Sequence, residues 1–198
     1  MRSLALAFLS CLLAAPAAAQ DPDDLRLGGH FALGVLGEAD ASIGGLSGSA
    51  ELDPTLGFGA RVDLPVHDYV AIGGQLELLF FDQGRADREA VFDFNAYVRL
   101  RYAIELSRDS MWIEPYVQLP FGLALAAFQE GDDVWPGFNT GALAGAWFIF
   151  DFPLSFYAEV GWRHHQVFSE QRVLGADVDL KVVTNQLAMN AGVSLILE

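Results

Sequence analysis

Four neighbouring residues have the side-chain types used in nucleophilic catalysis. His164 and His165 are followed by Ser169 and Glu170, which would supply a base, a nucleophile and an orienting carboxylate. The spacing does not complete that arrangement, because the residue two positions after His164 is Gln166, which has no nucleophilic hydroxyl. We therefore expect His164 and His165 to be polar side chains at an interface, and we predict no catalytic residue.

Paired carboxylates are the second kind of candidate site. Asp132 and Asp133 are adjacent, and Asp177 and Asp179 are separated by one residue. Carboxylate oxygens suit hard divalent cations, although acidic segments between strands are more often simply solvated. His30 has no second ligand at a metal-binding spacing. The sequence thus predicts acidic surface groups that could attract cations, but no built metal site and no cofactor.

A third group consists of ten charged residues that share one phase of an alternating pattern. They are five positive and five negative side chains, namely Arg26, Arg61, Asp63, Glu77, Asp93, Arg99, Arg101, Glu114, Glu159 and Arg163. The opposite phase contains no Asp, Glu, Lys or Arg in any of the alternating segments. Because buried charges persist only when paired, equal numbers of both signs predict an ion-paired interior.

The segments that carry these charges alternate apolar and polar residues with the period of a β-strand. Eight such segments are expected, at 25–37, 56–64, 69–81, 91–104, 111–127, 137–150, 155–168 and 182–197. Short links fall at 65–68, 105–110 and 151–154, and longer links at 38–53, 82–90, 129–136 and 169–181. Strict alternation of short and long links is typical of a membrane β-barrel, in which the long loops gather at one end.

Composition supports one apolar domain and excludes several classes of function. The 198 residues are 53% hydrophobic and 19% charged, with a formal net charge of -15. Such acidity argues against a nucleic-acid partner, since no basic stripe faces the phosphates. The single cysteine, Cys11, excludes an intrachain disulfide.

The first twenty residues have the pattern of a cleaved signal peptide. Arg2 is followed by an apolar run from Leu4 to Ala15 and by small residues up to Ala19. An alternative in which Cys11 is the lipidated first residue of a lipoprotein would leave a very short apolar region before it. We expect a signal peptide at 1–20 and a single barrel domain at 21–198, with no later apolar run long enough for a transmembrane helix.

These features together resemble the small outer-membrane β-barrel superfamily typified by OmpA, OmpX and OmpW. The resemblance rests on the signal peptide, the eight segments and the stretches LPVHDYVAIGGQLEL, PYVQLPFG and NAGVSLIL. It implies an all-β, eight-stranded antiparallel up-and-down transmembrane barrel with short periplasmic turns and longer outer loops, located in the outer membrane. Members usually end in an aromatic residue, whereas this chain ends in Glu198.

Three alternatives remain beside this interpretation. A secreted lipocalin-like barrel would turn its apolar phase inward, but it would carry a lysine-rich exterior, and this chain has one lysine, Lys181. Outer-membrane proteases use paired carboxylates, but they are larger barrels and need a histidine in the opposing loop. Outer-membrane lipid A deacylases place a His-x-Ser pair on the lipid face, which His164 and Gln166 do not match.

The expected function is that of a monomeric structural or surface-interaction barrel with a plugged lumen, because eight strands enclose only enough space for side chains. A narrow path for small or apolar solutes, as suggested for OmpW-like barrels, is the alternative. The expected partners are outer-membrane lipids and lipopolysaccharide, bridged to the acidic loops by divalent cations.

Overall fold

Ten antiparallel strands make up almost all of the part of the chain that the structure describes. The computed structural model describes residues 24–82, 88–107, 111–127, 134–151, 153–173 and 176–197. The strands are β1 (Leu25–Ile43), β2 (Leu46–Leu52), β3 (Thr55–His67), β4 (Val70–Asp82), β5 (Arg88–Arg101), β6 (Ile104–Ser107), β7 (Met111–Ala127), β8 (Val134–Phe150), β9 (Leu154–Val173) and β10 (Ala176–Leu197). No helix in the described residues is long and apolar enough to cross a membrane.

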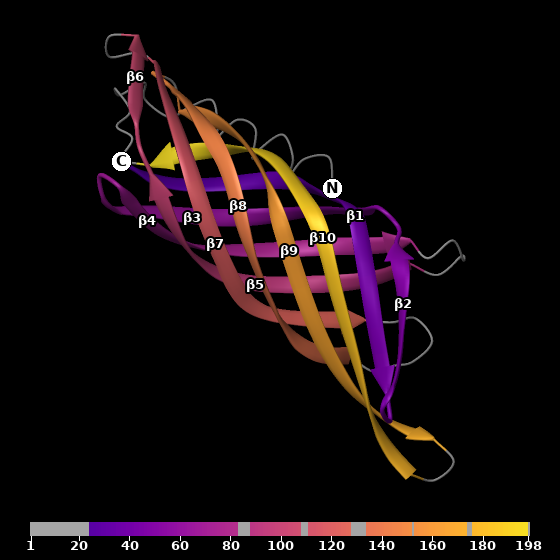
Figure 1. The fold of residues 1–198 in the computed structure, drawn as a ribbon. Helices are drawn as coiled ribbons and strands as arrows, with labels where there is room; N and C mark the ends of the chain where they lie inside the picture. Colours follow the sequence, from indigo (N-terminus) through magenta and orange to yellow (C-terminus); the bar gives the residue numbers. More distant parts are fainter. Residues whose placement is uncertain are drawn as a thin grey trace, which may run out of the picture.

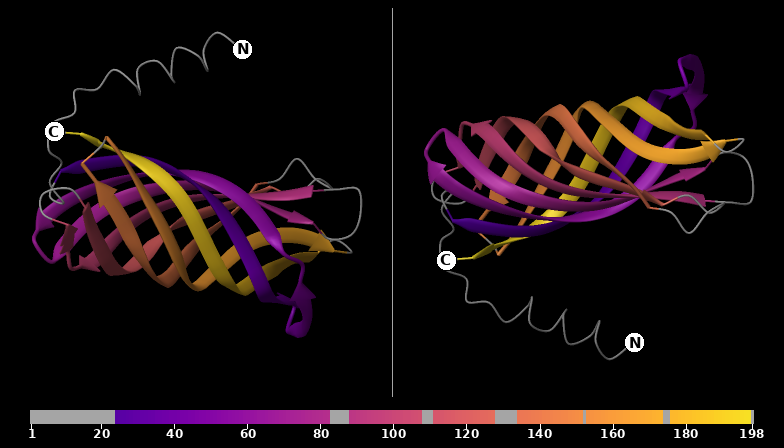
Figure 2. Two further views of the ribbon diagram at one scale, coloured as in Figure 1. Left: turned by 90° about the horizontal axis from the view of Figure 1, so that it is seen from above. Right: turned by 90° about the horizontal axis from the view of Figure 1, so that it is seen from below.

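Eight of these strands close into a barrel (Figures 1 and 2). The order is β1, β3, β4, β5, β7, β8, β9 and β10, and the circle closes because β10 pairs with β1 as well as with β9. The short strands β2 and β6 lie outside this circle and pair with β1 and β7. The predicted eight-stranded up-and-down barrel is confirmed.

The two phases of each strand face opposite environments, as the alternation predicts. Outward side chains are large and apolar, and Phe31 and Leu123 expose 78% and 64% of their surface. Inward side chains are polar and buried, with Arg99 and Gln118 both at 0% exposure. An apolar exterior around a polar interior is the reverse of a soluble barrel, and it excludes the lipocalin-like alternative.

The strands are strongly staggered around the barrel. From Asn95 the paired residues lead through β4 and β3 to Gly28, and in the other direction through β7, β8, β9 and β10 to Ala39. The two paths therefore reach β1 at positions eleven residues apart. One of these eleven residues is the extra residue of a β-bulge. Such a stagger requires strongly tilted strands and leaves an interior that side chains alone can fill.

Two hairpins extend the barrel wall beyond its rim at one end. Residues 38–43 of β1 pair with β2 on one side and with β10 on the other, and β10 continues to pair with β9 up to Val173. We call this four-stranded extension the outer sheet; it comprises β2, residues 38–43, residues 176–185 and residues 168–173 (Figure 1). The prediction that 38–53 and 169–181 are loops was therefore wrong for most of both segments.

A β-bulge explains why the alternation did not reveal this extension. The register of β1 against β10 shifts between Val35 and Glu38, and Leu36 has a φ of 52°. Before the bulge the even-numbered residues of β1 face inward, whereas Ala39 and Ile43, after it, share the face of the inward residues of β10. A fixed period of two therefore stops at the bulge although the strand continues.

We expect Gly45→Val to open the tip of the β1–β2 hairpin. Gly45 has a φ of 88°, and a left-handed conformation costs a residue with a side chain about 1–2 kcal/mol. Gly48→Val is the matched control, because it lies on the same hairpin without a positive φ, and an added Cβ meets open space at both positions. Proteolysis of the folded protein within 44–52 should accelerate about tenfold for Gly45→Val alone; equal rates for the two variants would contradict the turn geometry.

Candidate functional site

All ten charged residues of the predicted interior lie inside the barrel with buried side chains. Their exposure runs from 0% for Arg99 and Glu114 to 5% for Arg163. They come from β1, β3, β4, β5, β7 and β9, because residues of one phase on neighbouring strands point to a common axis. Their contacts form three levels along the barrel.

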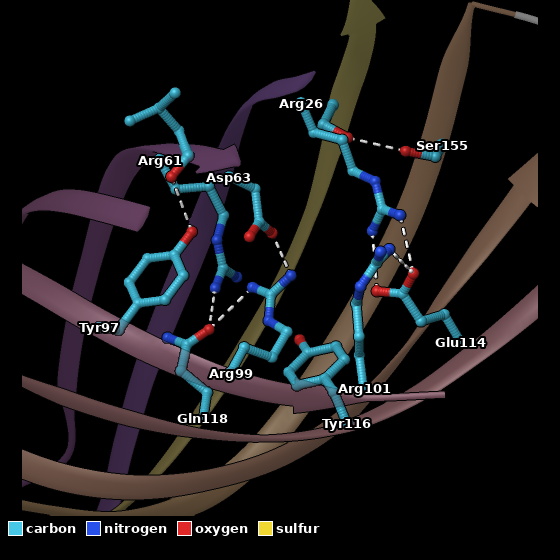
Figure 3. Close-up of polar contacts among 12 residues, drawn as sticks. Arg26, Arg61, Asp63, Tyr97, Arg99, Arg101, Glu114, Tyr116, Gln118 and Ser155 are labelled. Atoms are coloured by element: carbon cyan, nitrogen blue, oxygen red, sulfur yellow. Dashed lines mark hydrogen bonds and ion pairs between the residues drawn. The ribbon is translucent and has the colours of Figure 1, made fainter. Parts of the chain in front are cut away.

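The first level lies near the end where β1 begins and β10 finishes. Arg26 donates to both carboxylate oxygens of Glu114, at 2.9 and 2.7 Å, and Arg101 donates to Glu114 Oε2 at 3.0 Å (Figure 3). Arg101 also donates to the carbonyl oxygen of His67 at 3.1 Å. One carboxylate thus holds two guanidinium groups, and its 0% exposure leaves it no access to water.

The middle level is a network centred on two arginines. Arg99 pairs with Asp63, and both Arg99 and Arg61 donate to the amide oxygen of Gln118 (Figure 3). Arg61 also pairs with Glu159 at 3.3 Å. Charges of opposite sign from β3, β5 and β9 therefore meet around one neutral amide from β7.

Aromatic rings complete this middle level. The Arg99 guanidinium lies 4.3 Å from the ring centre of Tyr116, and that of Arg61 lies 4.6 Å from the ring centre of Tyr157. Tyr116 donates its hydroxyl proton to Glu159 at 2.6 Å. Trp147, at 0% exposure, packs against Tyr157 with ring centres 4.4 Å apart. Rings and guanidinium groups together occupy the cross-section.

The third level, toward the outer sheet, contains two histidines. Glu77 contacts Arg163 at 2.8 Å and His30 Nε2 at 2.8 Å. Asp93 contacts His165 Nε2 at 2.8 Å. His30, which shares the inward phase of β1 with Arg26, thus joins the interior network. The expectation that His165 lies at an interface was wrong, because it is 3% exposed and faces inward.

Above the histidines the interior becomes apolar. The residues that pack there are Ala32, Leu79, Phe81, Val91, Ala124, Ala126 and Val167, with Leu52, Trp135 and Val182 against them. We call this group the outer apolar cluster. Ala124 and Leu79 are both fully buried. The lumen is therefore filled from its first ionic level up to the base of the outer sheet.

Sequence reasoning missed the neutral members of the network. Gln118, Asn190, Tyr97, Tyr116 and Tyr157 are all buried and all share the inward phase with the charged residues. Their phase was the available signal, but a neutral amide or phenol does not reveal by type alone that it faces a lumen. Asn190 shows the omission clearly, since it donates to Glu159 at 2.8 Å.

The acidic residues proposed for cation binding fall partly outside the described residues. Asp132 and Asp133 lie there, as does the side chain of Asp177, whereas Asp179 is exposed on the outward face of β10. Within the described residues no three His, Cys, Asp or Glu side chains come together as a metal site. The structure thus shows no preformed cation site in that part of the chain.

The residue types of nucleophilic catalysis are also separated. His164 faces outward and His165 inward, because neighbouring residues of a strand point to opposite faces. Ser169 lies opposite Leu180, five residues beyond His164 on β9, and the side chain of Glu170 lies outside the described residues. The hydrogen-bond partner of His164 is Asn185. Among the described side chains of this group, no nucleophile and base are brought together.

Comparison with known proteins places the chain by its fold. No family model and no curated protein sequence matches it. The solved structures that resemble it include Neisserial surface protein A, with a TM-score of 0.50, 12% identity and coverage of 87% of this chain and 97% of that one. OprG of Pseudomonas aeruginosa has a TM-score of 0.46 and 10% identity, with coverage of 89% of this chain and 96% of that one. Ail of Yersinia pestis has a TM-score of 0.36 and 9% identity, with coverage of 85% of this chain and 99% of that one. The chain has the fold of small eight-stranded outer-membrane barrels.

We expect Glu114→Gln to destabilise the barrel strongly. The change leaves Arg26 and Arg101 without their shared carboxylate, and removing one partner of a buried ion pair costs about 3–5 kcal/mol. Glu51→Gln, on the exposed face of β2, should change stability by less than about 0.5 kcal/mol. Urea unfolding in lipid vesicles, followed by tryptophan fluorescence, measures both; similar midpoints for the two variants would show that the first ionic level contributes little.

Proposed function

We propose that this protein is an integral outer-membrane barrel that conducts no ions and serves as an anchor for the outer sheet at the cell surface. The observation that carries the proposal is the filled lumen. Arg61, Arg99 and Trp147 occupy its middle at 2% exposure or less, and the outer apolar cluster fills the part above them. A barrel without an aqueous path can act only through its surfaces.

The exterior supports insertion into a membrane. Phe92 of β5 and Tyr102, the residue after its end, bound the apolar band there. Ten residues at ~3.3 Å each, tilted by about 40°, span roughly 25 Å along the barrel axis. This matches the height of the apolar band of known outer-membrane barrels. The ring of Tyr102 stacks on Tyr69 with centres 6.0 Å apart, as expected of an aromatic girdle at the end of that band.

The outer sheet supports a surface role. Within the described residues β2 pairs with β1 alone, so its second edge is open to a further strand. Glu38, Asp40 and Glu51 are exposed on its outward face, and Glu38 lies directly opposite Glu51. Like charges in that position repel each other. We propose that divalent cations shared with lipopolysaccharide phosphates offset this repulsion.

A second candidate function is passage of apolar solutes into the outer mouth. It is favoured by one observation: the outer apolar cluster continues through Leu52 and Val182 onto Ala39, Ala41 and Ile43, which share its face of the outer sheet. The tight packing of the cluster argues against a standing channel, because Ala124 and Leu79 are fully buried. Passage would require the cluster to open.

An enzymatic role is not part of the proposal. Among the described residues His164 Nδ1 donates one hydrogen bond, to the amide oxygen of Asn185 at 2.9 Å. A lipid A-modifying enzyme would need a nucleophile within about 3 Å of that base. We therefore propose a non-enzymatic surface protein.

Planar-bilayer recordings test the sealed lumen. The wild-type protein should give no steady single-channel steps. Trp147→Ala combined with Tyr157→Ala removes two large uncharged side chains from the middle level while retaining the ion pairs, and it should give small steps because water then enters. Trp162→Ala, on the outward face, is the control and should remain silent. Regular steps from the wild-type protein would overturn the proposal.

Uptake of radiolabelled octane by cells with and without the protein tests the second candidate. If apolar solutes pass, the protein should accelerate uptake several-fold. Val182→Asp should abolish the gain, because it places a charge against the outer apolar cluster. Val183→Asp changes the adjacent outward residue and should retain the gain. Equal uptake with and without the wild-type protein would exclude this candidate and leave the anchor role.

A further inference from the structure

A hydrogen-bonded polar pair lies on the outward, largely apolar face of the barrel. His164 of β9 and Asn185 of β10 are cross-strand partners, and His164 Nδ1 donates to Asn185 Oδ1 over 2.9 Å. Because an amide oxygen only accepts, Nδ1 carries a proton, and in the neutral imidazole the opposite ring nitrogen, Nε2, is an acceptor. Within the described residues Nε2 has no partner. The pair therefore offers an acceptor on the ring and a donor on the Asn185 amide.

Aromatic rings place this pair at the upper limit of the apolar band. Trp162 stacks on His164 with ring centres 5.6 Å apart, and Phe138 lies 6.1 Å from the same ring. Asn185 of the pair lies opposite Glu38 of β1, and from this position outward the exterior face becomes acidic. Tryptophan rings at such a boundary lie at the level of the lipid headgroups.

Below the pair, beyond Trp162 and Leu187 of the same two strands, the outward face is hollowed. The depression has a volume of about 790 Å³, and it begins on the same two strands, at Val160 of β9 and Met189 of β10. Its floor is made of small residues, Ala144, Ala158 and Ala191. Phe31 and Phe58 form part of its wall, and Phe31 is 78% exposed. The hollow opens sideways into the region that the bilayer would occupy.

The lining also shows the width of the hollow. It comes from six neighbouring strands, β8, β9, β10, β1, β3 and β4. At ~4.8 Å between strands these extend about 24 Å around the wall. This is wider than one hydrocarbon chain, and it suits a lipid with several chains side by side.

We propose that the hollow and the His164–Asn185 pair together bind an acylated glycolipid of the outer leaflet. Its acyl chains lie in the hollow, and the sugar hydroxyls and amide linkages near the chains hydrogen-bond to His164 Nε2 and the Asn185 amide. Glu38 lies opposite Asn185, so a phosphate bound at this level would need a divalent cation between the two anions. On β10 the first cationic side chain beyond Asn185 is Lys181, four residues further out.

Native mass spectrometry of protein extracted in mild detergent tests this inference. The inference rests on the proposed outer-membrane location, which a heat-induced shift of the protein on a denaturing gel checks separately. Protein reconstituted with equal amounts of lipid A and phosphatidylethanolamine should retain one lipid A. His164→Leu combined with Asn185→Leu should reduce retention about tenfold, the effect of losing two neutral hydrogen bonds.

Two further variants separate the parts of the site. Ala191→Phe fills the floor of the hollow and should also reduce retention, whereas Ala96→Phe, an outward residue of β5 away from the hollow, should not. Gln166→Leu is the control for the polar pair, because it removes a neighbouring side chain of the same strand. All variants must keep the heat-induced shift.

Three outcomes would overturn the inference. Equal lipid A retention by the wild-type protein and the double variant would show that the pair does not bind the headgroup. Preferential retention of phosphatidylethanolamine would identify a phospholipid as the occupant. A mass of two chains that disappears with Ala191→Phe would show that the hollow receives a second copy of the protein.

Discussion

The structure depends on the pairing of full charges in a space that excludes bulk water. An unpaired guanidinium or carboxylate in such a space would cost several kcal/mol, so each of the ten charges requires a partner from another strand. Glu114 of β7 can hold Arg26 of β1 and Arg101 of β5 only if all three strands keep their register. The polar interior thus fixes the position of each strand relative to the others, which lipid contacts on the exterior cannot do.

The same need for paired charges accounts for the division of the molecule into a closed barrel with a polar interior and the outer sheet beyond it. The ionic levels need a complete circle of strands, and the outer apolar cluster fills the rest of that circle above them. Within the described residues only β9, β10, β1 and β2 continue beyond the circle, and the inward face that they share is apolar at Val182, Ala41 and Ile43. The outward face shows the opposite change, from the apolar residues around Met189 to the acidic Glu38 and Asp40. The boundary between the two arrangements marks the expected surface of the membrane.

Much of this could be predicted from the sequence because period-two alternation directly reports which side of a sheet a residue faces. It identified the eight barrel strands and the phase that carries Arg61, Glu77 and the other inward charges. It could not identify which charges pair, since that depends on the stagger between strands. The expectation that His165 lies at an interface overlooked this alternation, because Arg163, two residues earlier, has the inward phase. The extension of β1 was missed because Leu36 interrupts the period without ending the strand.

Because of that interruption, the faces of the β1–β2 hairpin depend on whether an odd or an even number of residues is gained or lost at the bulge. The extra residue at Leu36 and Gly37 puts Ala39 and Ala41 on the inward face and Glu38 and Asp40 on the outward face. Loss of one residue there would exchange the two sets and turn the carboxylates over the apolar mouth. Loss of two would preserve the sides and only shorten the hairpin. In this segment, changes in length by even numbers of residues are therefore compatible with the fold, whereas odd changes reverse its faces.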